Sequence, residues 1–201
     1  MIAALALATG CSGEQSLSEQ YPTQWKTCNA LLGTGNMESL REIVDSDDLR
    51  FSRRSLPVEQ IQKGLTREAI EPYDEYKGFD EYEVCGLSGD GQFKAMAMWA
   101  ADNLRAVQAD TELWHRAAED VYVANTSYVV GDVNLLFRCD IKGAGEQQKQ
   151  VLIETRITTP GNRKALVDLR RRLIVHLSRA LRDELACTNR PDIPSDLAIG
   201  G

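Results

Sequence analysis

Five cysteines are the residues of this 201-residue chain whose chemistry is easiest to predict. Cys11 follows an apolar run, and the small residues Thr9 and Gly10 stand directly before it. Small side chains at this place are typical of a signal-peptide cleavage site. A cysteine just after the cut offers its sulfur for alkylation. The pattern therefore predicts a lipidation site at Cys11.

Residues 5–12, with the letters LALATGCS, resemble the lipobox of bacterial lipoproteins. The polar stretch and paired cysteines that follow resemble small two-disulfide surface lipoproteins of the actinobacterial type, most of which have no assigned activity. The resemblance implies acylation of Cys11, as in a palmitate-bearing lipoprotein, and anchoring on the extracytoplasmic face of the cell membrane. Residues 1–10 contain no Lys or Arg, so we expect a signal peptide truncated at its start. The alternative is a buried N-terminal segment with an incidental cysteine.

The other cysteines form an even set outside the reducing cytosol, where disulfides persist. A four-cysteine zinc site is disfavoured, because structural zinc ligands usually come in close pairs and these residues are far apart. We therefore expect two disulfides among Cys28, Cys85, Cys139 and Cys187.

Residues 85–91 and 139–145 share one spacing, namely Cys, any residue, an aliphatic residue, any residue, Gly, any residue, Gly. Strand-like segments flank both stretches, which predicts two related β-hairpins with glycines in their turns. The turns would be Gly89-Asp90-Gly91 and Gly143-Ala144-Gly145.

This repeat limits the disulfide pairing. Cys85 and Cys139 hold equivalent places, so each should join a helical cysteine and not the other. Two pairing schemes remain. The first pairs Cys28 with Cys85 and Cys139 with Cys187, and the second pairs Cys28 with Cys139 and Cys85 with Cys187. We expect the first, since elements close in sequence are usually neighbours in space.

Apolar residues at helical spacing predict helices over residues 25–44, broken near Gly33, and over 104–118 and 160–187. The predicted class is α+β, an antiparallel sheet of two related hairpins packed against the amphipathic C-terminal helix and an N-terminal helix. On the polar side of the C-terminal helix we expect a solvated face and not a lipid contact. Its residues are Lys164, Arg171, Ser178, Arg179 and Arg182.

The predicted domain organisation has four parts. Residues 1–10 are the signal peptide, and 11–22 are the lipidated cysteine with a flexible tether. Residues 23–190 form a single globular domain, and 191–201 are a frayed tail.

Residues 68–83 are strongly acidic and contain interleaved aromatic residues. Such a stretch could form an acidic and aromatic patch for a cationic ligand, because aromatic faces attract cations. The alternative is an acidic surface whose rings pack inward. The candidate patch consists of Tyr73, Glu75, Tyr76, Asp80 and Tyr82.

No catalytic motif accompanies these features. His115 and His176 are isolated, and we interpret both as structural residues on helices. A net charge of −7 argues against nucleic acid as a partner, and no residue pattern indicates a metal or cofactor. We therefore expect a non-enzymatic, membrane-tethered binding or interaction module of the cell envelope, whose partner is an envelope protein or a small ligand. The alternative is an envelope hydrolase that uses a carboxylate pair.

Replacing Cys11 with Ser should abolish acylation and signal-peptide processing, because the proposed anchor depends on the sulfur of that residue. The native protein should partition into detergent, and the variant should take up no radioactive fatty acid. A native chain that remains unlabelled in cells where other lipoproteins are labelled would contradict the anchor.

Overall fold

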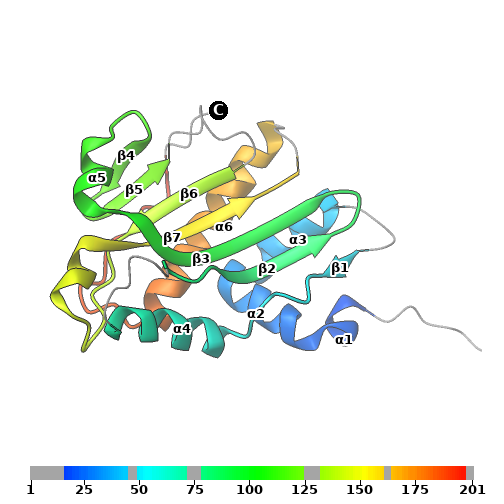
Figure 1. Ribbon diagram of the computed structural model, residues 1–201. Helices are drawn as coiled ribbons and strands as arrows, with labels where there is room; N and C mark the ends of the chain where they lie inside the picture. The colour runs from blue at the N-terminus through cyan, green and yellow to red at the C-terminus, as the bar shows by residue number, and fades with distance from the viewer. Residues whose placement is uncertain (1–15, 45–48, 72–77, 125–131, 161–163, 198–201) are drawn as a thin grey trace, which may run out of the picture.

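The computed structural model describes residues 16–44, 49–71, 78–124, 132–160 and 164–197. Within them, seven strands form one antiparallel sheet with the order β1-β2-β3-β7-β6-β5-β4 (Figure 1). The strands are β1 (Arg50–Phe51), β2 (Tyr82–Ser88), β3 (Gln92–Asn103), β4 (Trp114–Ala118), β5 (Val121–Ala124), β6 (Asp132–Phe137) and β7 (Val151–Thr158). The helices are α1 (Leu17–Gln20), α2 (Pro22–Leu32), α3 (Thr34–Val44), α4 (Val58–Ile70), α5 (Leu104–Ala109), the 3₁₀ helix η1 (Glu146–Gln150) and α6 (Lys164–Glu184). The fold class is α+β, as predicted.

Helices α3 and α6 lie behind the sheet in Figure 1, and the main core fills the space between the layers. Strand residues alternate between the two faces, so Leu135 of β6 joins this core. Its neighbour Leu136 joins a second, smaller cluster on the opposite face, under α5. Buried Thr155 of β7 and Ser178 of α6 share a hydrogen bond of 2.7 Å, so Ser178 does not belong to a solvated face as predicted.

The prediction for the first hairpin is confirmed, because β2 and β3 pair through the turn at residues 89–91. The second prediction is only partly right. Strands β6 and β7 do pair, but β6 ends at Phe137, and residues 138–150 form a longer connection that contains η1. Cys85 lies inside β2, whereas Cys139 lies beyond the end of β6. The repeated spacing therefore does not describe two equivalent hairpins.

The helix predicted over residues 104–118 is wrong in its second half. Helix α5 ends at Ala109, and Trp114–Ala118 forms the edge strand β4 paired with β5. His115 consequently lies on a strand and is exposed. Sheet pairing and burial of the Trp114 side chain prevail over the local helical spacing.

The N-terminal helices break where predicted, at Gly33, whose φ is +86°. This conformation suits glycine, and the position is also crowded, because an added Cβ would lie 2.9 Å from Nε2 of His176. Nδ1 of His176 lies 3.3 Å from the carbonyl oxygen of Leu31. His176 therefore packs α6 against the break between α2 and α3, which is a structural role.

Both end segments that were predicted to be flexible contain residues that the structure places against the folded body. Within the predicted tether, Leu17–Gln20 form α1 and α2 begins at Pro22. The backbone N–H of Ser16 donates to the Glu19 carboxylate, and Leu17 packs against the core. The predicted frayed tail is also wrong up to residue 197. Ile193 and Leu197 are buried, with exposed fractions of 0% and 1%.

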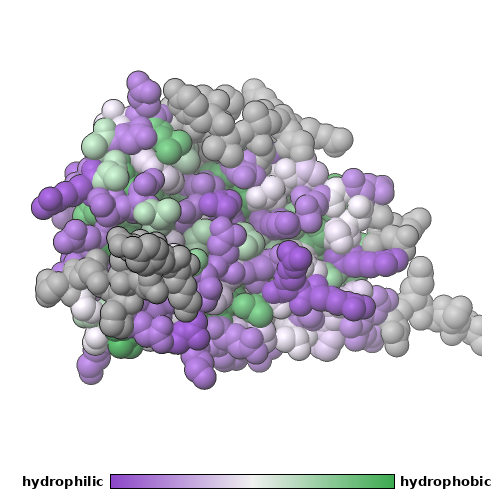
Figure 2. Space-filling model, in the orientation of Figure 1, coloured by the Kyte–Doolittle hydropathy of each residue, from purple (hydrophilic) through white to green (hydrophobic). Residues whose placement is uncertain are grey.

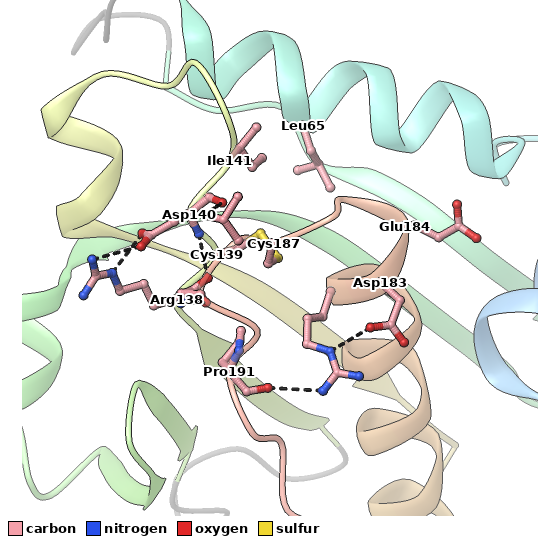
Figure 3. The surroundings of a disulfide bond; sticks show 12 residues. Leu65, Arg138, Cys139, Asp140, Ile141, Asp183, Glu184, Cys187 and Pro191 are labelled. Carbon is pink, nitrogen blue, oxygen red and sulfur yellow. Dashed lines mark hydrogen bonds and ion pairs between the residues drawn. A yellow bond between two sulfur atoms is a disulfide. The ribbon is translucent and has the colours of Figure 1, made fainter.

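Arginines of α6 hold the tail, which corrects the solvated face expected for that helix. Arg179 donates from Nε and Nη2 to the carbonyl oxygen of Ile193, at 3.0 and 2.6 Å. Arg182 donates to the carbonyl oxygen of Pro191 and to the carboxylate of Asp183 (Figure 3).

The disulfides are Cys28–Cys85 and Cys139–Cys187, the first of the two schemes. Cys28–Cys85 joins α2 to β2. The second bridge joins the segment after β6 to the segment after α6 (Figure 3). Backbone contacts reinforce it, since the N–H of Thr188 donates to the carbonyl oxygen of Asp140. Each bridge therefore fastens a helix or its end to one half of the sheet.

No helix in the described ranges has the length and apolar character needed to cross a bilayer.

Replacing both Cys139 and Cys187 with Ser should lower the free energy of unfolding by about 4 kcal/mol, because the bridge closes a loop of roughly fifty residues. It should also speed hydrogen exchange at Thr188, next to the broken bridge. The matched control replaces Cys28 and Cys85, which should cost a similar free energy and leave exchange at Thr188 unchanged. Calorimetry and native-state exchange measure both effects, and equal acceleration at Thr188 in the two variants would contradict the local role.

Candidate functional site

A cleft of about 620 Å³ lies where the C-terminal end of α4 meets one end of the sheet. Its lining comes from α4, from the segment before β2, from the last third of β3, and from η1 and β7. This volume falls within the range of small-molecule sites. Polar residues dominate the surface seen in Figure 2. Among the described residues, Ile70 is the one large hydrophobic residue that is widely exposed. A concave site with apolar lining therefore differs from the rest of the described surface.

Apolar side chains form much of the lining. Phe79 and Trp99 pack with ring centroids 6.3 Å apart, and Met98, Ala100 and Val151 add aliphatic surface. Trp99 is only 3% exposed, and its indole N–H donates to the carbonyl oxygen of Leu65, 3.0 Å away. This bond fixes α4 against β3, so the two walls of the cleft are held at a defined spacing.

Glu68 of α4 supplies a carboxylate to this lining. Its Oε1 accepts the hydroxyl of Tyr82 at 2.7 Å and the backbone N–H of Asp80 at 3.1 Å. Oε2 is buried and has no hydrogen-bond partner. Glu68 therefore joins α4 to the segment before β2 through one oxygen and leaves the other unsatisfied.

Burial dominates the ionisation of this group. Desolvation raises the pKa of Glu68 above its usual value, and the hydrogen bonds from Tyr82 and Asp80 offset only part of that increase. The pKa of the Tyr82 phenol is also raised, first by burial and then by its bond to Glu68. A carboxyl group with these properties retains its proton at a higher pH than an exposed glutamate does.

Glu154 and Arg156 contribute charges from β7. Arg156 donates to Oε1 of Glu154 at 2.8 Å, and the Asn134 amide donates to the same oxygen at 3.2 Å. The Glu154 side chain is 11% exposed and that of Arg156 is 32% exposed, so the carboxylate of this ion pair is more desolvated than the guanidinium. The positive charge of Arg156 is thus paired with Glu154 on the same strand.

The connection before β7 supports the remaining wall. Gln148 is buried, donates from Nε2 to the carbonyl oxygen of Cys139, and accepts the N–H of Ile141. Because Cys139 is bridged to Cys187, the end of the cleft formed by η1 is tied to the second disulfide.

The structure brings together few of the predicted patch residues. Tyr73, Glu75 and Tyr76 lie outside the described residues, as does Cys11. Tyr82 is 7% exposed with its hydroxyl bound to Glu68, so its ring packs inward and does not form an exposed patch. Asp80 lies 3.5 Å from Arg67 and forms an exposed ion pair with it.

Sequence reasoning missed most of the cleft. Glu68 and Phe79 belong to the acidic and aromatic stretch but were not chosen. The alternation that places Ile153, Thr155 and Ile157 on the core face also places residues 152, 154 and 156 on the opposite face. Two charged residues on that second face, Glu154 and Arg156, could have indicated from the sequence that this face carries a polar site.

Within the described ranges, no three or more His, Cys, Asp or Glu side chains converge as they would around a metal ion. No protein-family model matches the sequence, and no match was found among the curated proteins or the solved structures.

Replacing Gly64 with Ala should disturb this site, because an added Cβ would lie 2.5 Å from ring atoms of Tyr82. Overpacking of this kind costs about 1–3 kcal/mol, and a displaced Tyr82 would lose its bond to Glu68. Gly35→Ala is the matched control, since a Cβ there meets nothing within 4 Å and should stabilise α3 by up to about 1 kcal/mol. Thermal unfolding compares the two, and equal losses would contradict the close approach of Tyr82.

Proposed function

We propose that this chain is a lipid-anchored, extracytoplasmic binding module of the bacterial cell envelope and that the cleft beside α4 is its ligand site. The observation that carries the ligand site is a cleft of about 620 Å³ with an apolar lining and a few charged groups. Ligand sites commonly combine a mainly apolar lining with a small number of polar groups that orient the ligand.

The proposed location rests on the segment around Cys11 and is consistent with the two disulfides, which persist outside the reducing cytosol. Helix α1 begins at Leu17, so few residues separate Cys11 from the folded body. An acylated Cys11 would therefore hold the cleft near the membrane surface.

The second candidate is an envelope hydrolase with a carboxylate pair. Its support is Glu68, whose raised pKa suits a general acid and which shares the cleft with Glu81 and Glu154. Glu154, however, accepts hydrogen bonds from Arg156 and Asn134. Turnover of a chromogenic glycoside that disappears in Glu68→Gln would favour this alternative.

Placing a large ring in the cleft tests the binding function. Ala101 is exposed and lines the cleft, so Ala101→Trp should obstruct it without changing the core. The full chain carrying Cys11→Ser is screened against a small-molecule fragment library by ligand-observed NMR. We expect a set of binders that Ala101→Trp weakens by about tenfold or more.

Ala109→Trp is the matched control, because Ala109 is exposed on α5 and does not line the cleft. It should leave the same fragments bound. Fragments that bind equally well to both Trp variants would place ligand binding elsewhere and overturn the proposed site.

A further inference from the structure

The unbalanced charges of the cleft indicate what kind of ligand it would select. Among the described residues that line it are three glutamates, Glu68, Glu81 and Glu154, and one arginine, Arg156. Arg156 is paired with Glu154, and among the described residues that line the cleft no other cation accompanies Glu68 and Glu81. An anionic ligand would meet this excess negative charge.

Glu68 has an unmet hydrogen-bonding need. Its buried Oε2 receives no hydrogen bond, although an ionised carboxylate oxygen away from water is costly without a donor. Oε1 is held by Tyr82 and Asp80, so Oε2 is the oxygen of this carboxyl group that still lacks a donor. An ammonium group supplies donors and a positive charge, whereas an alcohol supplies one donor and no charge.

The apolar lining strengthens the same preference. Met98, Phe79 and Val151 line the same cleft as the carboxylates, and Coulombic attraction is larger where apolar surroundings lower the effective dielectric constant. These side chains also offer a surface to the hydrocarbon part of a ligand. The described lining of the cleft therefore combines carboxylates with apolar side chains.

We infer that the cleft binds a small organic ammonium ion with an apolar body, whose charged head lies at Glu68 and Glu81. This inference rests on the proposed function, because it assigns a ligand class to the same cleft. It keeps the cationic ligand expected from the sequence and replaces the exposed tyrosines with a cleft lined by Phe79 and Trp99.

The groups around Glu68 give the preference a pH dependence. Tyr82 and Asp80 face it from β2 and the preceding segment, Arg67 lies beside it on α4, and Glu81, Glu154 and Arg156 share the cleft. The raised pKa of Glu68 keeps a larger fraction of this acid neutral as the pH falls. Affinity for a cation should therefore rise with pH as Glu68 ionises.

The test uses three isosteric probes, phenethylammonium, 2-phenylethanol and phenylacetate, with the full chain carrying Cys11→Ser. Titration calorimetry gives the affinities, and NMR signals of the Met98 methyl and the Trp99 indole report occupancy of the cleft. We expect the ammonium to bind at least tenfold more tightly than the alcohol, as one charge-assisted hydrogen bond would produce, and phenylacetate to bind least.

Glu68→Gln keeps an acceptor for Tyr82 and removes the charge, and Glu81→Gln alters an exposed side chain. Each should weaken the ammonium about tenfold, and Glu68→Gln should also flatten the pH dependence. Glu38→Gln, at an exposed position on α3, is the matched control and should change nothing. Melting temperatures verify that each variant is folded.

The outcomes separate the two proposals. If the alcohol and the ammonium shift the Met98 and Trp99 signals with equal affinity, the cleft is a ligand site and the charge preference is wrong. If Glu38→Gln weakens the ammonium as much as Glu81→Gln does, the assignment of the charged head is wrong. If no probe shifts either signal while Ala101→Trp still abolishes fragment binding, the ligand class is wrong and the proposed site stands.

Discussion

The antiparallel pairing of β3 with β7 joins the two halves of the sheet, and both the core and the cleft depend on it. Met98 lies opposite Glu154, and the next pair is Trp99 with Ile153. Because neighbouring side chains point to opposite faces, Met98 and Glu154 face away from the main core, whereas Trp99 and Ile153 belong to it. Trp99 also contributes to the lining of the cleft. A one-residue shift of register would exchange these faces, so packing against α6 also fixes the positions of the cleft residues.

Each disulfide stabilises one of the two halves of the sheet that the pairing of β3 with β7 joins. Cys28–Cys85 fastens α2 to β2 on one side, and Cys139–Cys187 fastens the end of α6 to the connection between β6 and β7 on the other. Gln148 lies in the same connection and contacts the backbone of Cys139. The second bridge therefore supports one wall of the cleft as well as the C-terminal segment.

Local sequence patterns predict which helices and strands form better than they predict where these end or which other elements they contact. Alternation predicts β6 and β7, and apolar spacing predicts α6, because each signal lies within one element. The strand β4 and the buried Ile193 were missed, since β4 requires β5 beside it and Ile193 requires Arg179 on α6. The cleft was missed for the same reason, as α4, β3 and β7 meet only through contacts between residues far apart in the chain.

Glu68 shows why the cleft is difficult to explain by folding alone. A neutral glutamine could accept the same hydrogen bonds from Tyr82 and Asp80 without an ionisable group in a desolvated position. The carboxylate instead leaves Oε2 buried without a donor, and burial raises its pKa. Residues that are unfavourable for folding stability are often found at functional sites. This unsatisfied carboxyl group lines a cleft of about 620 Å³ that also holds apolar side chains able to accommodate a ligand, so a ligand with a hydrogen-bond donor would meet it there.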